Sequence, residues 1–429
     1  MKIGIGILGL GTVGSGVLEI IRKQATIWKE SYGFDFHVVL ACARSIETRR
    51  HFDALGYTTT ASADEVLEHP EVKIILELVG GYDLPLQWTK KAFSLGKHVI
   101  TANKALIAKH GSELFPLSAE AKVYFEFEAA VAAGIPIIKS IQESFVGNRI
   151  SSLSGIINGT CNYILTEMSQ QGSAYQDVLA VAQAKGYAEA DPTFDVEGID
   201  AAHKLAILAS LCSRQFVDFE KMHIEGISQI TQADLQFLDS NDYVIKLLGC
   251  FQQLDGCLRA RVHPAILPKD HLLASVDGVL NAAYLEMDAF GSTLQTGAGA
   301  GKLPTASGVI GDLVSVGRSI FSGVSNPISM AFYNRDNPAV IESISELETK
   351  YYMRFSVKDE AGVLSKITGL LSDSNISVDS IQQPHSEVSG QATIAVLTHE
   401  AKESQVERVL SEIAQQDFTL ETPHRIRFL

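Results

Sequence analysis

Hydrophobic residues open the chain in an almost unbroken run that ends in a cluster of glycines. From Lys2 to Leu8 the residues are mainly Ile, Leu and Gly, a pattern typical of a strand buried on both faces of a parallel sheet. Beyond the glycines, apolar residues return at helical spacing at Val13, Val17 and Ile20. The N-terminus is therefore predicted to be a strand, a glycine-rich turn and an amphipathic helix.

Shorter apolar runs follow and alternate with helical patterns. Strands are predicted at 36–42, 72–79, 98–101 and 123–131, with a helix through Trp88 between the second and the third. Strands that alternate with helices favour a doubly wound parallel sheet. An α/β domain with a Rossmann-like fold is therefore expected at this end of the chain.

The middle of the chain combines helices with several strands in direct succession. The predicted order is helix 137–145, a strand from Ser152 that meets a helix at 158–160, helix 175–185, a helix from Ile199, and strands 244–253, 257–264 and 279–287. Successive strands indicate a sheet that is open on one side or covered by a partner subunit. We therefore expect an α+β domain here that can pair with a second subunit.

The C-terminal segment has its own alternation of elements. These are strand 352–357, helix 363–371, strands 376–381 and 393–397, helix 406–413 and strand 418–428. The order βαββαβ is that of a ferredoxin-like domain. The expected domains are a dinucleotide-binding domain at 1–133 completed by a helix at 304–322, a substrate and dimerisation domain at 134–303, and a ferredoxin-like domain at 350–429.

Composition narrows the class of protein. The chain has 429 residues, too many for one ordinary core, and a formal net charge of −15. That charge argues against nucleic acid as a partner, because no basic stripe is available to neutralise phosphates. Five scattered cysteines without a Cys-x-x-Cys pair favour reduced thiols. Without a signal peptide or an apolar run long enough to span a bilayer, a cytoplasmic protein with no membrane association is expected.

Gly9, Gly11 and Gly14 have the Gly-x-Gly-x-x-Gly spacing between the first strand and its helix. In dinucleotide-binding folds the first glycine permits the tight turn and the second lets the backbone approach the pyrophosphate. The third lets the helix pack on the strand. The helix N-terminus then offers free N–H groups to the phosphates. In this context the motif predicts a dinucleotide cofactor.

The second strand ends beside the expected position of the adenosine ribose. An NAD site usually has an Asp or Glu there to bind the 2′-hydroxyl, but this chain has Arg44, with Arg49 and Arg50 close behind. A guanidinium can bind a 2′-phosphate bidentately. We therefore predict a preference for NADP (NADPH) over NAD; the alternative is that Arg44 is a solvated loop charge.

The acidic stretch at 185–204 is the main candidate for catalysis outside the nucleotide motif. It ends in a predicted helix on which Asp200 and Lys204 are four residues apart and share one face. Lys104 follows a strand, at the edge where open α/β sheets bind ligands. Taken alone, the composition of the acidic stretch favours a solvated turn with a surface ion pair, and Lys104 could equally be part of a plain turn.

Glu128 precedes a loop of small residues whose backbone carbonyls are potential ligands. One carboxylate with backbone oxygens suits a monovalent cation. The alternative is that Glu128 caps the helix predicted at 137–145. A second glycine-rich loop at 295–304 is either a linker or a loop that closes over the cofactor.

Several motifs, in this order, resemble the homoserine dehydrogenase family. They are Gly-Leu-Gly-Thr-Val-Gly at 9–14, Thr-Ala-Asn-Lys at 101–104, Asn-Gly-Thr at 158–160, Gly-Tyr-Ala-Glu-Ala-Asp-Pro at 186–192 with Gly-Ile-Asp-Ala-Ala-His-Lys at 198–204, and Gly-Ala-Gly at 299–301 with Leu-Pro-Thr at 303–305. The resemblance implies an enzyme that interconverts L-homoserine and L-aspartate 4-semialdehyde with NAD(P), in threonine, methionine and isoleucine biosynthesis. Because the chain begins at the nucleotide fold, the form without an aspartate kinase is expected.

The resemblance also implies roles for individual residues. Lys204 and Lys104 correspond to the active-site lysines, and Glu189 and Asp200 to the substrate-binding carboxylates. The family usually has a hydroxyl residue where this chain has Cys161. The cofactor-binding positions, with the glycine motif and Arg44 included, are Gly9, Leu10, Gly11, Thr12, Val13, Gly14, Arg44, Lys104, Gly186 and Gly301. The implied sodium ligands are Glu128 and the backbone oxygens near Val131, Ala133 and Ile135.

Within the C-terminal segment, Asp-x-x-Gly-Val-Leu at 359–364 resembles the ACT domain, a small-molecule sensor of amino-acid enzymes, although Ala361 replaces the more usual proline. Threonine is the expected effector, bound where this turn meets the following helix. The alternative is a dimerisation module without a ligand. A homodimer or homotetramer is expected.

Two other functions remain open at this point. A phosphorylating semialdehyde dehydrogenase would need an activated cysteine, for which Cys161 is the candidate. A dinucleotide-binding redox sensor without catalysis would have no need of Lys104, Glu189, Asp200 and Lys204, so their presence favours an enzyme. In an enzyme, a lysine whose pKa is lowered by burial or by a second lysine would take the hydroxyl proton.

Overall fold

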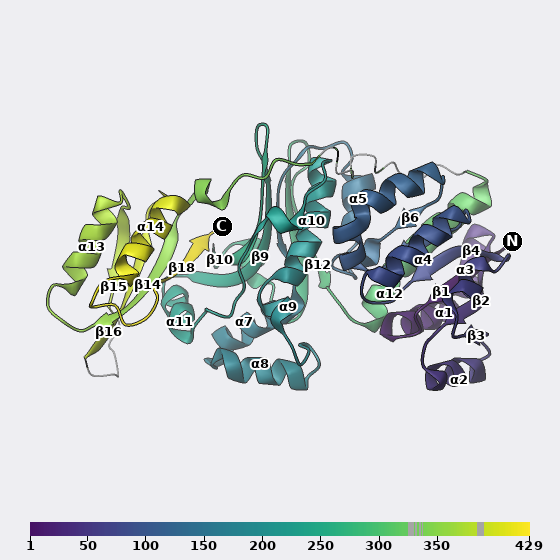
Figure 1. The fold of residues 1–429 in the computed structure, drawn as a ribbon, viewed down its shortest axis with the longest axis horizontal. Coiled ribbons are helices and arrows are strands. Elements are labelled where there is room, and N and C mark those ends of the chain that lie inside the picture. The colour runs from purple at the N-terminus through teal and green to yellow at the C-terminus, as the bar shows by residue number, and fades with distance from the viewer. Residues whose placement is uncertain (325–329, 331–332, 334–335, 337, 384–389) are drawn as a thin grey trace.

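The computed structural model describes residues 1–324, 330, 333, 336, 338–383 and 390–429. The molecule is elongated, with the N-terminal part at one end, the C-terminal part at the other, and the central part between them (Figure 1). Two large sheets organise it: a six-stranded sheet near the N-terminus and a ten-stranded sheet that occupies the rest.

The N-terminal sheet has the order β3-β2-β1-β4-β5-β6, and its neighbouring strands are parallel. Its elements are β1 (Lys2–Leu8), α1 (Thr12–Tyr32), β2 (Asp35–Cys42), α2 (Ile46–Ala54), β3 (Thr59–Thr60), α3 (Ala63–Glu68), β4 (Val72–Glu77), α4 (Asp83–Ser94), β5 (His98–Thr101), α5 (Lys104–Glu120) and β6 (Phe125–Glu126). Hydrophobic cores lie on both faces, with α1 on one and α3 to α5 on the other. Burial on both faces explains the near-continuous apolar runs. The predicted doubly wound, Rossmann-like sheet is confirmed.

Helix α12 (Lys302–Ser322) returns from the central part to this domain and packs against α1. The approach is close because Gly16 has no side chain: a Cβ there would lie 2.7 Å from the carbonyl oxygen of Lys302. An ion pair of 3.0 Å between Lys302 and Glu19 also joins the two helices. A segment far along the sequence therefore covers one face of the N-terminal sheet.

Three predicted elements are wrong in extent. The last predicted strand, at 418–428, is shortened to β18 (His424–Phe428). The segment 123–131 contains only the short β6 and a 3₁₀ helix, η1 (Glu128–Ala130), instead of one long strand. The strand ends because Glu128 bonds the backbone of the next helix and Ala132 takes a φ of +49°. The predicted loop at 295–304 is also shorter, since β12 (Gly291–Ala298) and α12 leave only 299–301 between them.

The second sheet has the order β12-β11-β7-β9-β10-β18-β14-β16-β15. Its strands are β7 (Ile150–Ile156), β9 (Tyr243–Gln253), β10 (Leu258–Pro268), β11 (Leu280–Met287), β14 (Tyr351–Lys358), β15 (Val378–Gln382), β16 (Gln391–Thr398) and β18 (His424–Phe428), and the short β8 (His223–Ile224) pairs with β10. The central helices are α6 (Ile137–Lys139), α7 (Gly159–Gln171), α8 (Tyr175–Ala184), α9 (Thr193–Val196), α10 (Ile199–Ser213) and α11 (Gln232–Ser240). Helix α10 is buried along most of its length and contacts β9 and β10.

The C-terminal part has the predicted βαββαβ order. Helices α13 (Val363–Asp373) and α14 (Glu403–Ala414) pack with its four strands around a hydrophobic core made only of residues from this segment. The sheet is nevertheless continuous with the central part, because β18 pairs in parallel with β10. The C-terminal part therefore has its own hydrophobic core but is joined to the central part by backbone hydrogen bonds between β18 and β10.

Buried ion pairs reinforce this junction. Arg427 is fully buried, and its guanidinium donates to Glu403 at 2.6 Å and to Glu225, before β10, at 2.8 Å. Asp234, on α11, is also fully buried and accepts hydrogen bonds from Tyr352 and from Arg354, both at 2.8 Å. Loss of the C-terminal part would leave Glu225 and Asp234 without these cations, which is costly for buried charge.

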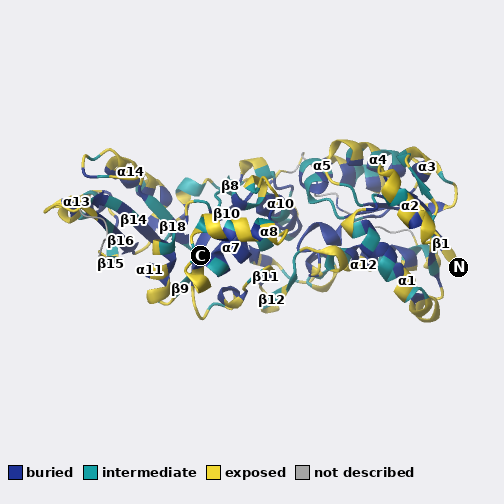
Figure 2. Cartoon of the chain, turned by 90° about the horizontal axis from the view of Figure 1, so that it is seen from below, coloured by how far each residue is buried: buried dark blue, intermediate teal, exposed yellow. Residues whose placement is uncertain are grey.

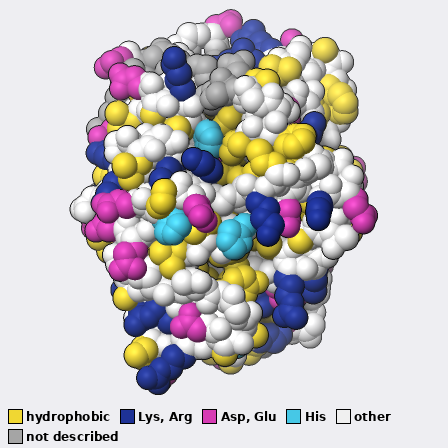
Figure 3. Space-filling view, turned by 90° about the vertical axis from the view of Figure 1, so that its right-hand side faces the viewer, with side chains coloured by type: hydrophobic (Ala, Val, Ile, Leu, Met, Phe, Trp, Pro, Cys, Tyr) yellow, Lys and Arg dark blue, Asp and Glu magenta, His cyan; other side chains and the backbone are white. Residues whose placement is uncertain are grey.

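The distribution of exposed residues follows these parts. Buried residues line the sheets, and exposed residues gather on the outer sides of the helices (Figure 2). On the end formed by the N-terminal part, Lys and Arg side chains are interspersed with Asp and Glu around hydrophobic ones (Figure 3). Of the helices that the structure describes, none is both long enough and apolar enough to cross a bilayer.

Candidate active site

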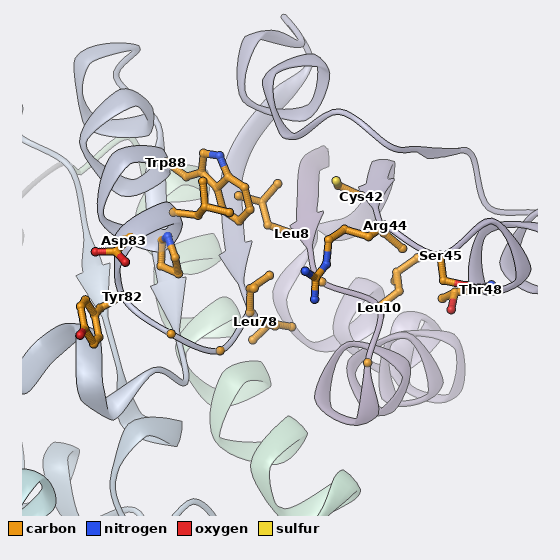
Figure 4. Close-up of a pocket in the computed structure, with 18 residues that line it drawn as sticks. Leu8, Leu10, Cys42, Arg44, Ser45, Thr48, Leu78, Tyr82, Asp83 and Trp88 are labelled. Carbon is orange, nitrogen blue, oxygen red and sulfur yellow. Dashed lines mark hydrogen bonds between the residues drawn. The ribbon is translucent and has the colours of Figure 1, made fainter.

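A cavity of about 720 Å³ lies at the carboxyl ends of β1, β2 and β4 (Figure 4). Its walls are formed by residues 8–11, 42–45 and 78–85 together with Thr48 and Trp88. In open α/β sheets, ligands bind at the carboxyl ends of the strands where the strand order reverses. Here β1 lies between β2 and β4, so the cavity occupies the position expected for a dinucleotide.

The three motif glycines meet three different steric demands. Gly9 has a φ of +105°, and a Cβ there would lie 2.7 Å from the carbonyl oxygen of Leu78. A Cβ on Gly14 would lie 2.1 Å from the carbonyl oxygen of Gly9, so the helix could not approach the strand. Around Gly11 a Cβ would meet nothing within 4 Å. The turn and the packing are thus fixed while the backbone at Gly11 faces open space, which fits a pyrophosphate.

Arg44 extends into the cavity, and Ser45 and Thr48 lie beside it at the start of α2 (Figure 4). Arg49 instead holds the loop, since its guanidinium donates to the carbonyl oxygens of Ala43 at 2.7 Å and Arg44 at 2.8 Å. Ser45 and Thr48 were missed by the sequence analysis. A serine placed to cap a helix directly after a strand was the available signal.

Glu77, at the end of β4, is a buried carboxylate to which the sequence analysis gave no role. Its oxygens accept hydrogen bonds from the backbone N–H of Val79 at 2.8 Å and from the Thr101 hydroxyl at 2.7 Å. Burial raises the pKa of Glu77 to about 7. Asn103 donates to the carbonyl oxygens of Val79 at 3.1 Å and Gly81 at 2.6 Å. This network fixes the cavity wall to the start of α5.

The first residue of α5, Lys104, meets α10 at a buried carboxylate. The ammonium of Lys204 lies 2.7 Å from one oxygen of Asp200, and that of Lys104 lies 3.2 Å from the other. Lys204 also donates to the carbonyl oxygen of Ile157 at 2.7 Å. Because Asn103 caps α5 and bonds the cavity wall, the two lysines lie next to the nucleotide cavity. The surface ion pair considered from sequence is instead a triad around the buried carboxylate of Asp200.

The carboxylate between the lysines remains ionised. Burial by itself raises the pKa of Asp200, but the charges of Lys204 and Lys104 outweigh it and lower the pKa to about 2. The side chain of Asp200 is only 6% exposed, so little solvent screens these charges. The negative charge of Asp200 therefore lies between the two ammonium groups and reduces their mutual repulsion.

Asn158 connects this triad to the neighbouring acid. Its amide donates to Asp195 at 2.8 Å and to Asp200 at 2.9 Å, while its oxygen caps α7. From the sequence, Asn158 is predicted as a helix start within the Asn-Gly-Thr motif, and Asp195 has no predicted role. Cys161 lies beneath them, fully buried, and burial raises its pKa well above the usual range. A buried, protonated thiol is not an activated nucleophile.

Three predicted site residues lie apart from the triad. Glu189 is exposed, and its carboxylate makes no hydrogen bond or ion pair with a described residue. Gly186 ends α8 with a φ of +74°, and Gly301 precedes α12 with a φ of +116°. Neither glycine lines the nucleotide cavity, and neither do Thr12, Val13 and Gly14, which lie within α1.

Glu128 is engaged as a helix cap. Its two carboxylate oxygens accept hydrogen bonds from the backbone N–H groups of Ile138 at 2.9 Å and Lys139 at 2.8 Å. Burial and the nearby Asp312 raise the pKa of Glu128 to about 7. Glu128 therefore caps the helix that begins at Ile137, as the alternative to a cation site predicted. The buried carbonyl oxygens of Val131 and Ala133 accept no hydrogen bond from a described residue, so they remain available to a cation.

Family models match nearly the whole chain. One described as "Homoserine dehydrogenase" matches residues 136–314, and one described as "Homoserine dehydrogenase, NAD binding domain" matches residues 9–128. A third, "ACT domain", matches residues 351–418. These three matches follow the order of the N-terminal, central and C-terminal parts.

Individual relatives agree with these models. A homoserine dehydrogenase of Pseudomonas aeruginosa is 44% identical over 95% of this chain and 94% of that protein. The crystal structure of a homoserine dehydrogenase from Thiobacillus denitrificans superposes with a TM-score of 0.93 at 42% identity, over 100% of this chain and 98% of that one. A hyperthermophilic archaeal homoserine dehydrogenase in complex with NADPH has a TM-score of 0.64 at 28% identity, over 74% of this chain and 98% of that one.

Proposed function

The chain belongs to the homoserine dehydrogenase family, and from that membership we propose that it interconverts L-homoserine and L-aspartate 4-semialdehyde with NADP(H). Enzymes of this family are oxidoreductases. The observation that carries the proposal is the Lys104–Asp200–Lys204 triad, joined through Asn103 to the wall of a dinucleotide cavity. A redox sensor without catalysis would not need this buried charge beside the cavity.

Lys204 transfers the proton in this proposal. Two of its three ammonium N–H groups are directed at Asp200 and at the carbonyl of Ile157, which leaves the third for the substrate oxygen. When bound, the nicotinamide accepts or supplies the hydride. In the reducing direction Lys204 donates its proton to the developing alkoxide, and Asp200 stabilises the charge of the lysine pair. Lys104, the second catalytic lysine, lies nearer the nucleotide cavity.

Glu189 and Asp200 are the proposed ligands for the substrate ammonium. The carboxylate of Glu189 is exposed and free of described partners, so it is available to a cation. Both oxygens of Asp200 already contact lysines, which makes positioning of the lysines its first role. Of the two carboxylates, Glu189 is therefore the one with oxygens free to bind the substrate ammonium.

A preference for NADP follows from the residues after β2. Arg44 lines the cavity with the hydroxyls of Ser45 and Thr48 beside it, and these groups suit the oxygens of a 2′-phosphate. The chain has no acidic residue at this position to bind a ribose 2′-hydroxyl. The archaeal relative in complex with NADPH is in keeping with this choice.

A sodium ion at Glu128 remains part of the proposal. The free carbonyl oxygens of Val131 and Ala133 would supply ligands, with Ile135 as the third backbone position. The ion would share the Glu128 oxygens with the two N–H groups that they already accept. Such a site is weak and suits a monovalent cation.

Threonine is the proposed effector, bound at 359–362 where the turn meets α13. The match to an ACT domain supports an amino-acid ligand. We also propose a homodimer or homotetramer, a cytoplasmic location, and a place in threonine, methionine and isoleucine biosynthesis.

Regulation is better tested by a point substitution than by a deletion. Because β18 pairs with β10 and Arg427 pairs with Glu225, removal of the C-terminal part would destabilise the central part as well as abolish inhibition. Asp359→Ala is therefore the cleaner test of regulation.

The experiment follows nucleotide oxidation in the presence of L-aspartate 4-semialdehyde. The proposal predicts rapid oxidation of NADPH, slower oxidation of NADH, and inhibition by millimolar threonine that Asp359→Ala weakens. Homoserine formed in the same reaction identifies the product. Absence of turnover with either nucleotide contradicts the proposed activity, while equal turnover with and without threonine contradicts the effector alone.

A further inference from the structure

A second cavity, of about 360 Å³, lies along the edge of β10, between β8 and the segment that leads into the C-terminal part. It shares no lining residue with the nucleotide cavity, and its volume is within the range of small-molecule pockets. Its charged and polar lining consists of Lys221, His223, Arg259, Arg261, Glu342 and Ser343.

Arg261 determines the chemistry of this cavity. The residue is only 9% exposed, and its Nε donates to Nε2 of His263 at 3.0 Å. Among the described residues, no carboxylate pairs with its guanidinium and no acceptor binds its terminal N–H groups. A buried guanidinium without a counter-charge is unfavourable. Its remaining donors are therefore available to an anionic ligand.

The histidine beside Arg261 cannot provide the missing negative charge. His263 is fully buried, and its Nδ1 lies 2.7 Å from the carbonyl oxygen of Pro264. Burial, with the charges of Arg427 and Arg261, lowers the pKa of His263 well below the usual range. It remains a neutral acceptor for Arg261.

The other charges around the cavity leave an excess of positive charge. Arg259 forms an ion pair with Glu342, and Lys221 is largely exposed. The charged lining thus has three positive residues, Lys221, Arg259 and Arg261, against the single Glu342. A local positive excess in a chain with a net charge of −15 favours an anion at this place.

We propose that this cavity binds a small dianion, either a phosphate monoester or a dicarboxylate, with Arg261 as the principal ligand-binding residue. Two negative charges match the excess of positive charge, and a guanidinium binds phosphate and carboxylate oxygens bidentately. The ligand would contact β10 through Arg261 and the following segment through Ser343. It would therefore join the central sheet to the segment that enters the C-terminal part.

The segment in question, residues 341–347, is attached to the rest of the chain by backbone hydrogen bonds at both ends. The N–H of Glu342 donates to the carbonyl oxygen of Leu258 at 2.8 Å, and the carbonyl oxygen of Leu347 accepts from the N–H of Glu403 at 2.8 Å. On the other wall, Lys221 ends the 3₁₀ helix η3 (Phe219–Lys221), in which the ring of Phe219 contacts that of His203 at 4.4 Å. His203 immediately precedes Lys204, so the site lies between the catalytic helix and the C-terminal part.

Isothermal titration calorimetry of the full-length protein tests the proposal, with inorganic phosphate and malonate as separate probes at constant ionic strength in chloride. Saturable binding of either is expected. Phosphate alone would identify a phosphate ester, and malonate alone a dicarboxylate. Arg261→Gln should weaken binding by about tenfold or more, and Arg261→Lys should retain part of it. Arg44→Gln is the matched control, because it removes anion binding at the nucleotide cavity and leaves this site intact.

Hydrogen exchange provides a second measurement. The bound probe should slow exchange at 340–347 in the wild type and in Arg44→Gln, but not in Arg261→Gln. If Arg261→Gln fails to fold, Lys221→Gln replaces it, with a smaller loss expected. The proposal is overturned if neither probe binds saturably, or if Arg261→Gln binds both as well as the wild type. It is also overturned if Arg261→Gln changes the oligomeric state while the wild type binds neither probe, since Arg261 then serves a subunit contact.

Discussion

The nucleotide cavity and the lysine triad lie side by side but are built differently. The cavity depends on backbone shape, with Gly9 and Gly14 leaving room that a methyl group would fill. The triad depends on charge, with Asp200 buried between Lys104 and Lys204 from two helices. The cavity should therefore be sensitive to substitutions that add volume, and the triad to substitutions that change charge.

Because of this difference, cofactor binding and turnover should respond to different substitutions. A steric change at the glycines should affect every step that needs the cofactor. A change of charge at the triad should slow the chemistry while the cofactor still binds, because Asn103 joins the triad to the cavity wall at Gly81 and not to the glycine turn at 9–14.

The largest effect is expected for Gly14→Ala. The added Cβ would lie 2.1 Å from the carbonyl oxygen of Gly9, so α1 must move away from β1 and the phosphate site is lost. We expect no measurable NADPH binding by fluorescence titration. Gly369→Ala is the control, because a Cβ within α13 meets nothing within 4 Å. Normal NADPH binding by Gly14→Ala would show that the glycine motif does not shape the cavity.

Asp200→Asn should leave the cofactor bound but slow the reaction. Without the carboxylate, the two ammonium groups lose their shared counter-charge, and the rate constant kcat should fall by about 10²- to 10³-fold. The dissociation constant of NADPH should change by less than about twofold. Asp191→Asn, an exposed acid of the same stretch, should leave both quantities unchanged. If Asp200→Asn loses NADPH affinity together with kcat, the triad is also needed for cofactor binding and the two regions are not separate in function.

Glu77 joins the two regions, and its charge should make stability depend on pH. Its pKa in the folded state is about 7, above the usual value of 4.5 for a glutamate, so the folded protein binds the additional proton. The stability from protonated Glu77 is complete below about pH 4.5 and is lost as the pH rises through 7, a change of up to about 3 kcal/mol. Relative to wild type, Glu77→Gln should gain stability in urea unfolding between pH 5 and pH 8. If the difference in the free energy of unfolding between Glu77→Gln and wild type stays the same from pH 5 to pH 8, the raised pKa of Glu77 is contradicted.

The smallest effect is expected at Arg44. Arg44→Gln removes a charge that only a 2′-phosphate needs, so the KM for NADPH should rise by about tenfold and that for NADH by less than about twofold. Initial rates with both nucleotides provide the comparison. Equal changes for the two nucleotides would show that Arg44 does not contact the 2′-phosphate.

Local patterns predicted the glycine turn of the cavity well because the parts of that turn are close together in the sequence. The strand, the glycine turn and the start of α1 lie within residues 2–17, and the spacing of Asp200 and Lys204 on one helix already implied a shared face. Lys104 could be placed at a strand end, but nothing in the sequence showed that Asp200 lies between it and Lys204. That arrangement comes from the packing of α5 against α10.

The residues that were missed owe their roles to distant partners. Glu77 needs Thr101 and the loop after β4, and Asn158 needs Asp195 and Asp200. The strand predicted at 123–131 failed for the same reason. The backbone N–H of Glu128 donates to Asp312 on α12 at 2.9 Å, a partner that alternating hydrophobicity near residue 128 cannot reveal.

The most direct test of the account is the behaviour of Lys204→Ala in two assays on the same preparation. Reduction of L-aspartate 4-semialdehyde by NADPH should fall by at least about 10³-fold, since the proton donor is gone. The dissociation constant of NADPH should remain within about twofold of the wild-type value. A variant that binds NADPH normally and still turns over at a substantial fraction of the wild-type rate would contradict the central role of Lys204.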